Sequence, residues 1–205
     1  MSQLKLTADS GGGTVAIKAP ASTTGNAALD LTVPGTASAT LDTLGRAGNI
    51  LQVVTGVKTD TASTTSTTMS DTGLSASITP SSSSNKILVS VVHPYHIRRS
   101  GSGIYEVYGG IDLLRGSTKI WKAPHNNNYG SGYLSMFISS PPGGAFTGMR
   151  GNFVINAIDS PNTTSSTTYK TQFAIDYSTT LSINNPGEDT NVVPSSIITL
   201  MEVAA

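Results

Sequence analysis

Residues 67–93 read TTMSDTGLSASITPSSSSNKILVSVVH, and the predicted fold is built outward from this stretch. Its first half mixes apolar residues with serine and threonine, and it ends at Pro80, because proline has no N–H with which to continue a strand ladder. The four serines and Asn85 that follow have the composition of a connection, since short polar side chains satisfy their own backbone in turns. We therefore expect a β-hairpin at the centre of a β-sandwich, with a turn or bulge at residues 71–73.

The second strand of this expected hairpin is apolar on both sides. Its two alternating sets are Ile87, Val89 and Val91 on one face, and Leu88, Ser90 and Val92 on the other. Successive side chains of a strand point to opposite faces of a sheet. The pattern therefore predicts a strand that is buried on one face and largely covered on the second.

The composition indicates a chain of many short strands with little charge. Serine and threonine are abundant, and the 205 residues include 21 glycines, which is typical of strands joined by tight turns. The 12 Lys+Arg balance the 12 Asp+Glu, so the chain has no formal net charge and we expect no nucleic-acid partner, which would need clustered positive charge. Cysteine is absent. We also expect no membrane insertion and no export signal, since no long apolar run and no signal-peptide core are found.

Residues 1–46 differ from the rest and predict an extended N-terminal β arm. Three short segments each place apolar residues on one face, namely Leu4 and Leu6, then Val15 and Ile17, then Leu29, Leu31 and Val33. So few apolar side chains do not offset the entropy of ordering the backbone, roughly 1–2 kcal/mol per residue. We expect the arm to need another surface, either sister chains or a socket in a larger assembly. The alternative is a disordered N-terminal tail.

Residues 47–205 predict the second domain, a jelly-roll β-sandwich head. We expect eight to ten strands between Asn49 and Ala205 and no helix of three turns. The clearest alternation covers residues 169–177, where aromatic and β-branched residues alternate with polar ones. A hairpin is expected around the turn at residues 115–118, and the apolar run 197–203 is expected inside a sheet.

The sequence does not favour catalysis or a metal site. His93 and His96 are three residues apart, which places them on opposite faces of a strand, and His125 lies in a distant loop. Neither a G-x-S-x-G elbow nor a phosphate-binding glycine motif occurs, and no pair of carboxylates can be matched for hydrolysis. We expect no enzyme activity, no cofactor and no metal. The pair at residues 98–99 fits a solvated strand end better than an anion site.

One polar loop is the candidate ligand-binding site. Residues 125–132 read HNNNYGSG, and the candidate residues are Trp121, Asn126, Asn127, Asn128, Tyr129 and Tyr133. Amides that bond hydroxyls, next to aromatic rings that stack on apolar faces, suit a sugar, so a host-surface glycan is the expected ligand. The competing interpretation places Trp121 and Tyr133 in the core or in a subunit interface and leaves only the asparagines in water.

Several stretches together resemble one family of viral proteins. These are residues 4–13 (LKLTADSGGG), 20–26 (PASTTGN), 64–92, the turn 113–118 (LLRGST) and the ending 195–204 (SSIITLMEVA). They resemble tail-fibre-like virion surface proteins of marine and freshwater bacteriophages, cyanophages among them. The resemblance implies a homotrimer with a jelly-roll head similar to the C1q/TNF-like trimeric domains.

The resemblance and the composition together predict a structural protein on the virion surface. The first expectation is a short trimeric fibre, docked to other virion proteins of the tail or capsid through residues 1–46, whose head contacts the host. The residues expected to attach it are the seven apolar residues of the arm. Since no long shaft separates arm and head, a head fibre or a capsid decoration trimer without a receptor role is the alternative. A third possibility is a free carbohydrate-binding module, which would be monomeric and would not need a strand-like arm.

Overall fold

The computed structural model describes residues 3–7, 14–18, 46–99, 106–122, 136–139, 148–175, 179–185 and 194–205. The chain divides into two units, Met1–Leu41 and Asp42–Ala205, and each is considered by itself. Every regular element in the described ranges is a β-strand, so the all-β prediction is confirmed. Within these ranges the structure has no helix of the length and hydropathy that a membrane crossing requires.

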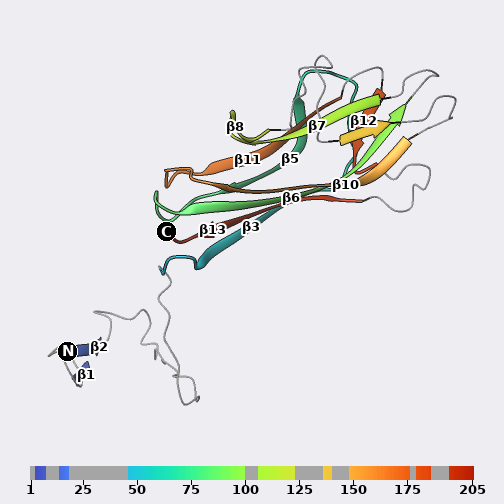
Figure 1. The fold of residues 1–205 in the computed structure, drawn as a ribbon. Helices are drawn as coiled ribbons and strands as arrows, with labels where there is room; N and C mark the ends of the chain where they lie inside the picture. Colours follow the sequence, from blue (N-terminus) through green and yellow to red (C-terminus); the bar gives the residue numbers. More distant parts are fainter. Residues whose placement is uncertain are drawn as a thin grey trace. The chain divides into compact units, whose positions relative to one another are not determined.

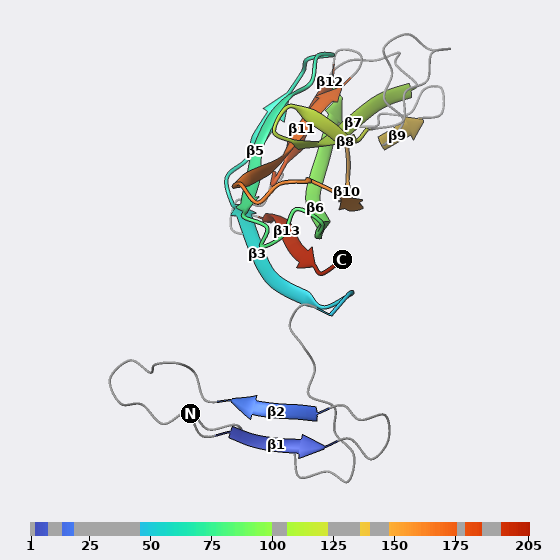
Figure 2. The ribbon, with the colours of Figure 1, turned by 90° about the vertical axis from the view of Figure 1, so that its left-hand side faces the viewer.

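The first unit contains a two-stranded antiparallel ribbon. Strands β1 (Gln3–Thr7) and β2 (Thr14–Lys18) run in opposite directions beside each other (Figure 2). Their register sets Leu4 opposite Ile17 and Leu6 opposite Val15. Because residues directly opposite each other lie on the same face of a ribbon, these four positions share one face. The third predicted segment, residues 29–33, lies outside the described ranges.

The second unit is a sandwich of two antiparallel sheets, as predicted, and both layers are seen in Figure 1. The β6 sheet has the order β3-β13-β6-β12-β4, with β10 also paired to β6. Its strands are β3 (Ile50–Lys58), β4 (Ala62–Thr64), β6 (Lys86–Arg99), β10 (Gly148–Asp159), β12 (Thr179–Ile183) and β13 (Ser196–Val203). The β11 sheet has the order β5-β11-β7-β8, with β9 paired to β7. Its strands are β5 (Ser70–Ile78), β7 (Glu106–Arg115), β8 (Thr118–Trp121), β9 (Met136–Ser139) and β11 (Thr167–Ile175).

Strand β6 is the longest strand and the centre of its sheet. Strand β10 pairs with it along one side, while β13 and then β12 pair along the other. The inward residues of its first half, Ile87, Val89 and Val91, are fully buried, as the alternation predicts. The prediction of a largely covered second face is not met within this chain, because Val92 on that side is 36% exposed.

The predicted hairpin between the two halves of residues 67–93 is wrong. Strand β5 pairs with β11, and β6 belongs to the opposite sheet. Each strand has one apolar face, and stacking the two faces across the core buries both, which edge-to-edge pairing would not do. The connection is held on the β6 sheet, because the Glu202 carboxylate accepts hydrogen bonds from Ser81 N (2.7 Å) and Asn85 Nδ2 (2.6 Å).

Two local predictions are confirmed. The expected irregularity at residues 71–73 is a bulge, since the β5–β11 register shifts there and Gly73 has a φ of 86°, a value that favours glycine. The expected hairpin around residues 115–118 is formed by β7 and β8, with Leu114 opposite Lys119.

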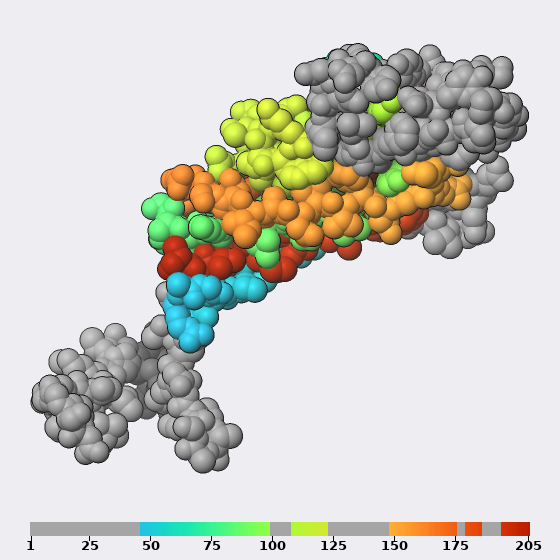
Figure 3. Space-filling view, viewed as in Figure 1, coloured from blue at the N-terminus to red at the C-terminus, as the bar shows by residue number. Residues whose placement is uncertain are grey.

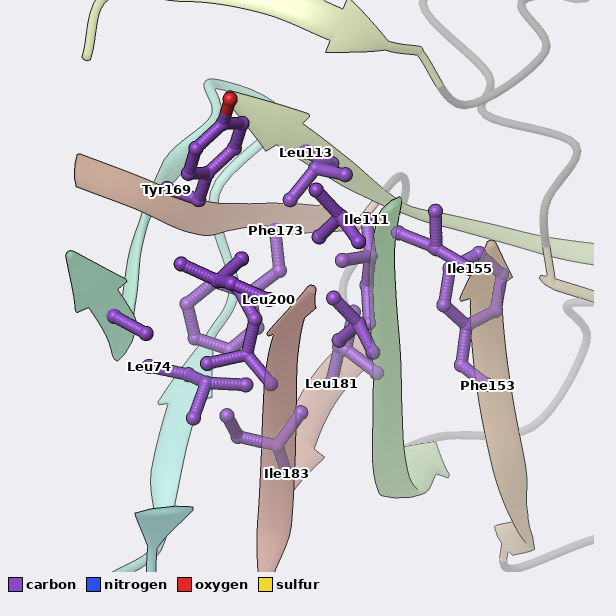
Figure 4. Packing of buried hydrophobic residues seen from close by; sticks show 14 of the residues in the cluster. Leu74, Ile111, Leu113, Phe153, Ile155, Tyr169, Phe173, Leu181, Ile183 and Leu200 are labelled. Carbon is purple, nitrogen blue, oxygen red and sulfur yellow. The ribbon is translucent and has the colours of Figure 1, made fainter. Parts of the chain in front are cut away.

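The core lies between the sheets and is mostly aliphatic. Figure 4 shows side chains from both sheets pointing toward one another. Leu74, Ile111 and Phe173 come from the β11 sheet, and Leu181 and Leu200 from the β6 sheet. Burying each such side chain contributes roughly 1.5–3 kcal/mol, so this interior is the main source of stability for the sandwich.

Candidate interaction surface

In the described part of the chain, the large apolar side chains that remain exposed lie on the β6 sheet. Among the described residues they are Ile50, Val53, Val57, Val92, Val154, Ile158 and Ile197. They belong to four neighbouring strands, β10, β6, β13 and β3. In Figure 3 the segments of β3 (cyan), β13 (red) and β6 (green) lie next to one another. We call the outer side of these four strands the apolar face.

The strand register arranges the apolar face in rows. One row consists of Val154, Val92, Ile197 and Val57, and a second consists of Ile158, Leu88, Met201 and Val53. Between them lies a polar row of Asn156, Ser90, Thr199 and Thr55. Opposed residues of adjacent strands lie about 5 Å apart, so each row is continuous across the sheet.

None of these twelve positions carries a charge. Lys86 follows beyond one end of the rows, and Arg150 lies beyond the other end, opposite His96. Burial of the His96 ring, together with the nearby Arg150 and Arg98 guanidinium groups, lowers the pKa of His96 from its usual value. The apolar face thus has a charge-free centre and a cationic margin.

The outer face of the β11 sheet has the opposite character. Lys170 Nζ lies 2.7 Å from Oδ2 of the exposed Asp71. Lys119 Nζ lies 2.6 Å from Oδ2 of Asp112, whose side chain is buried. Gln172 also donates a hydrogen bond to Asp71, at 2.7 Å. The Asp71–Lys170 pair is of the kind that suits a surface in contact with water. The two outer faces of the sandwich therefore differ in chemistry. The apolar face is the one whose composition indicates a binding partner.

Sequence reasoning missed the apolar face as a site, although part of the signal was visible. The outward positions are mainly valine and isoleucine, which favour strands on either face. The apolar residues on both sides of β6 already indicated that both faces of this strand pack against other residues. The register of the strands decides which residues of β3, β10 and β13 lie on that second face. This register is set by pairings between strands far apart in sequence.

A chain of buried hydrogen bonds joins the two sheets behind the apolar face. The fully buried His93 ring lies 2.7 Å from Ser196 Oγ through Nδ1 and 3.0 Å from Thr171 Oγ1 through Nε2. The Ser196 hydroxyl donates to Asn184 Oδ1 (2.7 Å), so Ser196 Oγ accepts the hydrogen bond from His93 Nδ1–H. Burial and the positive charge of Lys58 lower the pKa of His93 to about 4. His93 is therefore neutral at pH 7 and has a structural role.

A second polar cluster closes the end of the sandwich where the chain crosses between sheets. Burial alone would raise the pKa of Glu202, but hydrogen bonds from Asn85, Gln52 and Ser81 outweigh it and lower the pKa to about 2. Both donors of Ser81, its backbone N–H and its hydroxyl, point at the same carboxylate oxygen. The charge of Glu202 is thus well satisfied in the interior.

A third contact ties β10 to the opposite sheet. Arg115 Nη1 lies 2.8 Å from Asp159 Oδ2, and the Tyr169 hydroxyl donates to the same carboxylate at 2.7 Å. Burial and the neighbouring Asp159 carboxylate raise the pKa of Tyr169, so its hydroxyl remains a donor. Since β10 is at an edge of the described β6 sheet, this contact helps to hold Val154 and Ile158 in place.

The residues predicted as a ligand site are only partly described. Trp121 is half-buried at the end of β8, and its ring packs edge-on against Phe153 at a centroid distance of 5.7 Å. Part of the Trp121 side chain therefore packs against the core, and part of it remains exposed. Asn126, Asn127, Asn128, Tyr129 and Tyr133 lie outside the described ranges. In the part of the chain that the structure describes, no group of three or more His, Asp or Glu residues is placed to hold a metal ion.

Comparison with known proteins finds distant similarity to viral structures. No protein-family model and no curated protein matches the chain. The chain is similar to the structure of infectious bursal disease virus, Gt strain, with 15% identity over 94% of this chain and 45% of that chain, and a TM-score of 0.35. For the Gx strain the identity is 13%, the coverage is 98% and 46%, and the TM-score is 0.32. The chain spans less than half of each viral chain. Because a TM-score below 0.5 does not establish a common fold, the function is argued from the residues of this chain.

Proposed function

We propose that the chain is a structural subunit of a bacteriophage particle. In this role residues 47–205 form an oligomeric head, as a homotrimer on the virion surface, and residues 1–46 attach it to other virion proteins. The observation that carries the proposal is the apolar face, an open, charge-free area on a sandwich whose interior is otherwise well packed. A contiguous apolar patch of this kind marks a surface that is covered in the working state of a protein. The bacteriophage origin rests on the resemblance of the sequence.

The N-terminal unit supports an attachment role. In the β1–β2 ribbon the positions of Leu4, Leu6, Val15 and Ile17 lie on one face. An isolated two-stranded ribbon is marginally stable in water, so it gains stability when that face is covered by another surface. The remaining attachment residues, Leu29, Leu31 and Val33, are proposed for the same contact.

A structural role also agrees with the use of the polar groups in the interior. His93 and Ser196, the pair that would most readily suggest a hydrolase, are both fully buried. Both ring nitrogens of His93 are committed to hydroxyl partners, and the Ser196 hydroxyl donates to Asn184 rather than to a base. These contacts link strands and keep the Ser196 hydroxyl out of reach of a substrate.

Deletion of the arm tests the attachment. A chain that begins at Arg46 retains the bonds from Gly48 N to Ala204 O and from Ala204 N to Asn49 O, which close its first strand onto β13. We expect it to keep its β circular dichroism and its cooperative melt, and to be missing from particles assembled without the native protein. Normal incorporation of this shortened chain would show that residues 1–46 are not the anchor. Absence of the full-length chain from purified particles would contradict the virion role itself.

Host contact through the loop is the finer part of the proposal. We propose that Asn126, Asn127, Asn128 and Tyr129 meet a host-surface glycan, with Trp121 and Tyr133 at the margin of the site. Individual sugar contacts are weak, so binding would depend on several heads acting together. Replacing Asn126–Asn128 with serine and Tyr129 with alanine should abolish cell-surface binding and leave the melting temperature unchanged. If the native oligomer itself binds no host cell, the decoration role without a receptor is the better description.

A further inference from the structure

We infer that the apolar face is the surface through which copies of this chain bind one another. Its occupant is therefore a second copy of the same chain. The inference rests on the proposed role as a particle subunit, and it adds the interface: the outer side of β10, β6, β13 and β3.

The charge pattern favours a second copy over a different protein. The twelve positions in the three rows carry no charge, so two copies meet there without repulsion between like charges, and a partner of opposite charge has nothing to bind. Lys86 and Arg150 lie only at the margins. An apolar centre with a polar margin is the usual anatomy of a specific protein interface.

The polar row is complementary to itself. Its side chains, Asn156, Ser90, Thr199 and Thr55, each contain a donor and an acceptor in one group. The same row on a second copy can therefore satisfy them, whereas a wholly apolar partner would leave these polar groups without hydrogen bonds. A polar strip between two apolar rows also limits how two copies can slide past each other. We assign this row the role of fixing the register of the assembly.

The size of the apolar face fits an interface between copies. Strands lie about 4.8 Å apart and rise about 3.3 Å per residue. The three rows across four strands therefore cover roughly 300 Å², and the outer side of the same strands over about eight residues covers roughly 500 Å². Two such faces would bury about 1,000 Å² in total, which is near the lower limit for specific interfaces. Contacts at the margin would add to this area.

Two lysines placed on the apolar face test the inference in the full-length protein. Val57 and Val154 are 59% and 53% exposed and lie on strands β3 and β10, so a lysine at either position can reach water in a single copy. The test variant is Val57→Lys with Val154→Lys. The matched control is Ser77→Lys with Thr164→Lys, which adds the same charge at two exposed positions outside the apolar face.

The expected readout is the mass in solution by light scattering at micromolar concentration. The native protein and the control should have at least twice the chain mass of 21.1 kDa, and the test variant should fall to the mass of one chain. Circular dichroism should be the same for all three proteins. A native protein that is monomeric overturns the inference, as does a test variant that keeps the native mass. Dissociation of the control as well would also overturn it, because the effect would then not belong to this face.

A milder pair of substitutions covers the case in which the lysines prevent folding. Val57→Thr with Val154→Thr keeps the branched shape and replaces one methyl group with a hydroxyl at each site. It should raise the dissociation concentration at least tenfold. An unchanged dissociation concentration would overturn the inference. Failure of the proposed interface can be distinguished from failure of the proposed virion role. An oligomer sensitive to these changes but absent from particles would leave the interface standing and remove the virion role.

Discussion

His93 illustrates how single buried polar residues hold this sandwich together. It lies on β6, and its two ring nitrogens reach Ser196 on β13 of the same sheet and Thr171 on β11 of the other. Thr171 continues the chain to Thr72 on β5, with the two hydroxyl oxygens 2.6 Å apart. A neutral imidazole is needed for these contacts, because its unprotonated nitrogen accepts a hydrogen bond.

The first prediction at this scale concerns the pH dependence of folding. The pKa of His93 is about 4 in the folded chain, against 6.5 in the unfolded one. Between these values the unfolded chain binds a proton that the folded chain does not. The contribution of neutral His93 to the free energy of unfolding is therefore complete above pH 6.5. It is lost as the pH falls toward 4, by about 3 kcal/mol in all. Denaturant unfolding at pH 7.5, 5.5 and 4.5 measures this slope. The His93→Gln variant should have a flatter slope over that range, and an equally steep one would refute the assignment.

Glu202 should act in a lower pH range. The pKa of Glu202 is lowered to about 2 from 4.5. The ionised carboxylate therefore stabilises the fold above pH 4.5, and this stabilisation is lost as the pH falls toward 2. Glu202→Gln places an amide donor against groups that are themselves donors. The change should cost about 2 kcal/mol at pH 7. It should also flatten the acid-unfolding curve below pH 4.5. A variant as stable as the native chain would contradict the assigned role of the carboxylate.

At the scale of single elements, strand β3 shows how closely the sheets approach at one edge. A side chain at Gly56 would overlap the carbonyl oxygen of Ser75 on β5 and come within 2.9 Å of Ile198 Cγ2. Only a residue without a Cβ atom fits this contact. The glycine thus allows β3, which carries Val53 and Val57 on its outer side, to pack against the opposite sheet.

Gly56→Ala should therefore destabilise the sandwich by about 1–3 kcal/mol, since the overlap is with backbone that has little room to move. Thr59→Ala, at an exposed position just beyond β3, is the control and should change the free energy of unfolding by less than about 0.5 kcal/mol. Thermal melts of both variants provide the comparison. Equal melting temperatures for the two variants would mean that the edge relaxes and the close approach is not required.

The elements also show what the sequence could and could not predict. Alternation of apolar residues identified most of the strands correctly, because burial on one face imposes a period of two, as at residues 169–175. It did not predict that β5 and β6 lie in different sheets. That outcome depends on which strand pairs with which, and on contacts such as Glu202 with Ser81, which are 121 residues apart. The candidate loop at residues 125–132 is outside the described ranges, so its role stays a prediction.

At the scale of the whole molecule, the contrast between the two outer faces of the sandwich is the main clue to function. One face carries ion pairs such as Asp71 with Lys170, and the other carries two apolar rows without a charge. A monomer in water gains nothing from the second face. An assembled subunit gains stability from this face, because the residues that favour strand formation also provide the contact with the next copy.

Electron cryomicroscopy of intact particles that carry this chain is the most direct measurement of its role. We predict density for the head on the particle surface, with the apolar face of β10, β6, β13 and β3 buried between copies and the ion-paired face of the β11 sheet toward solvent. Particles without this density, or heads on the particle whose apolar face remains open to water, would contradict the proposed role of the protein as a self-associating virion subunit.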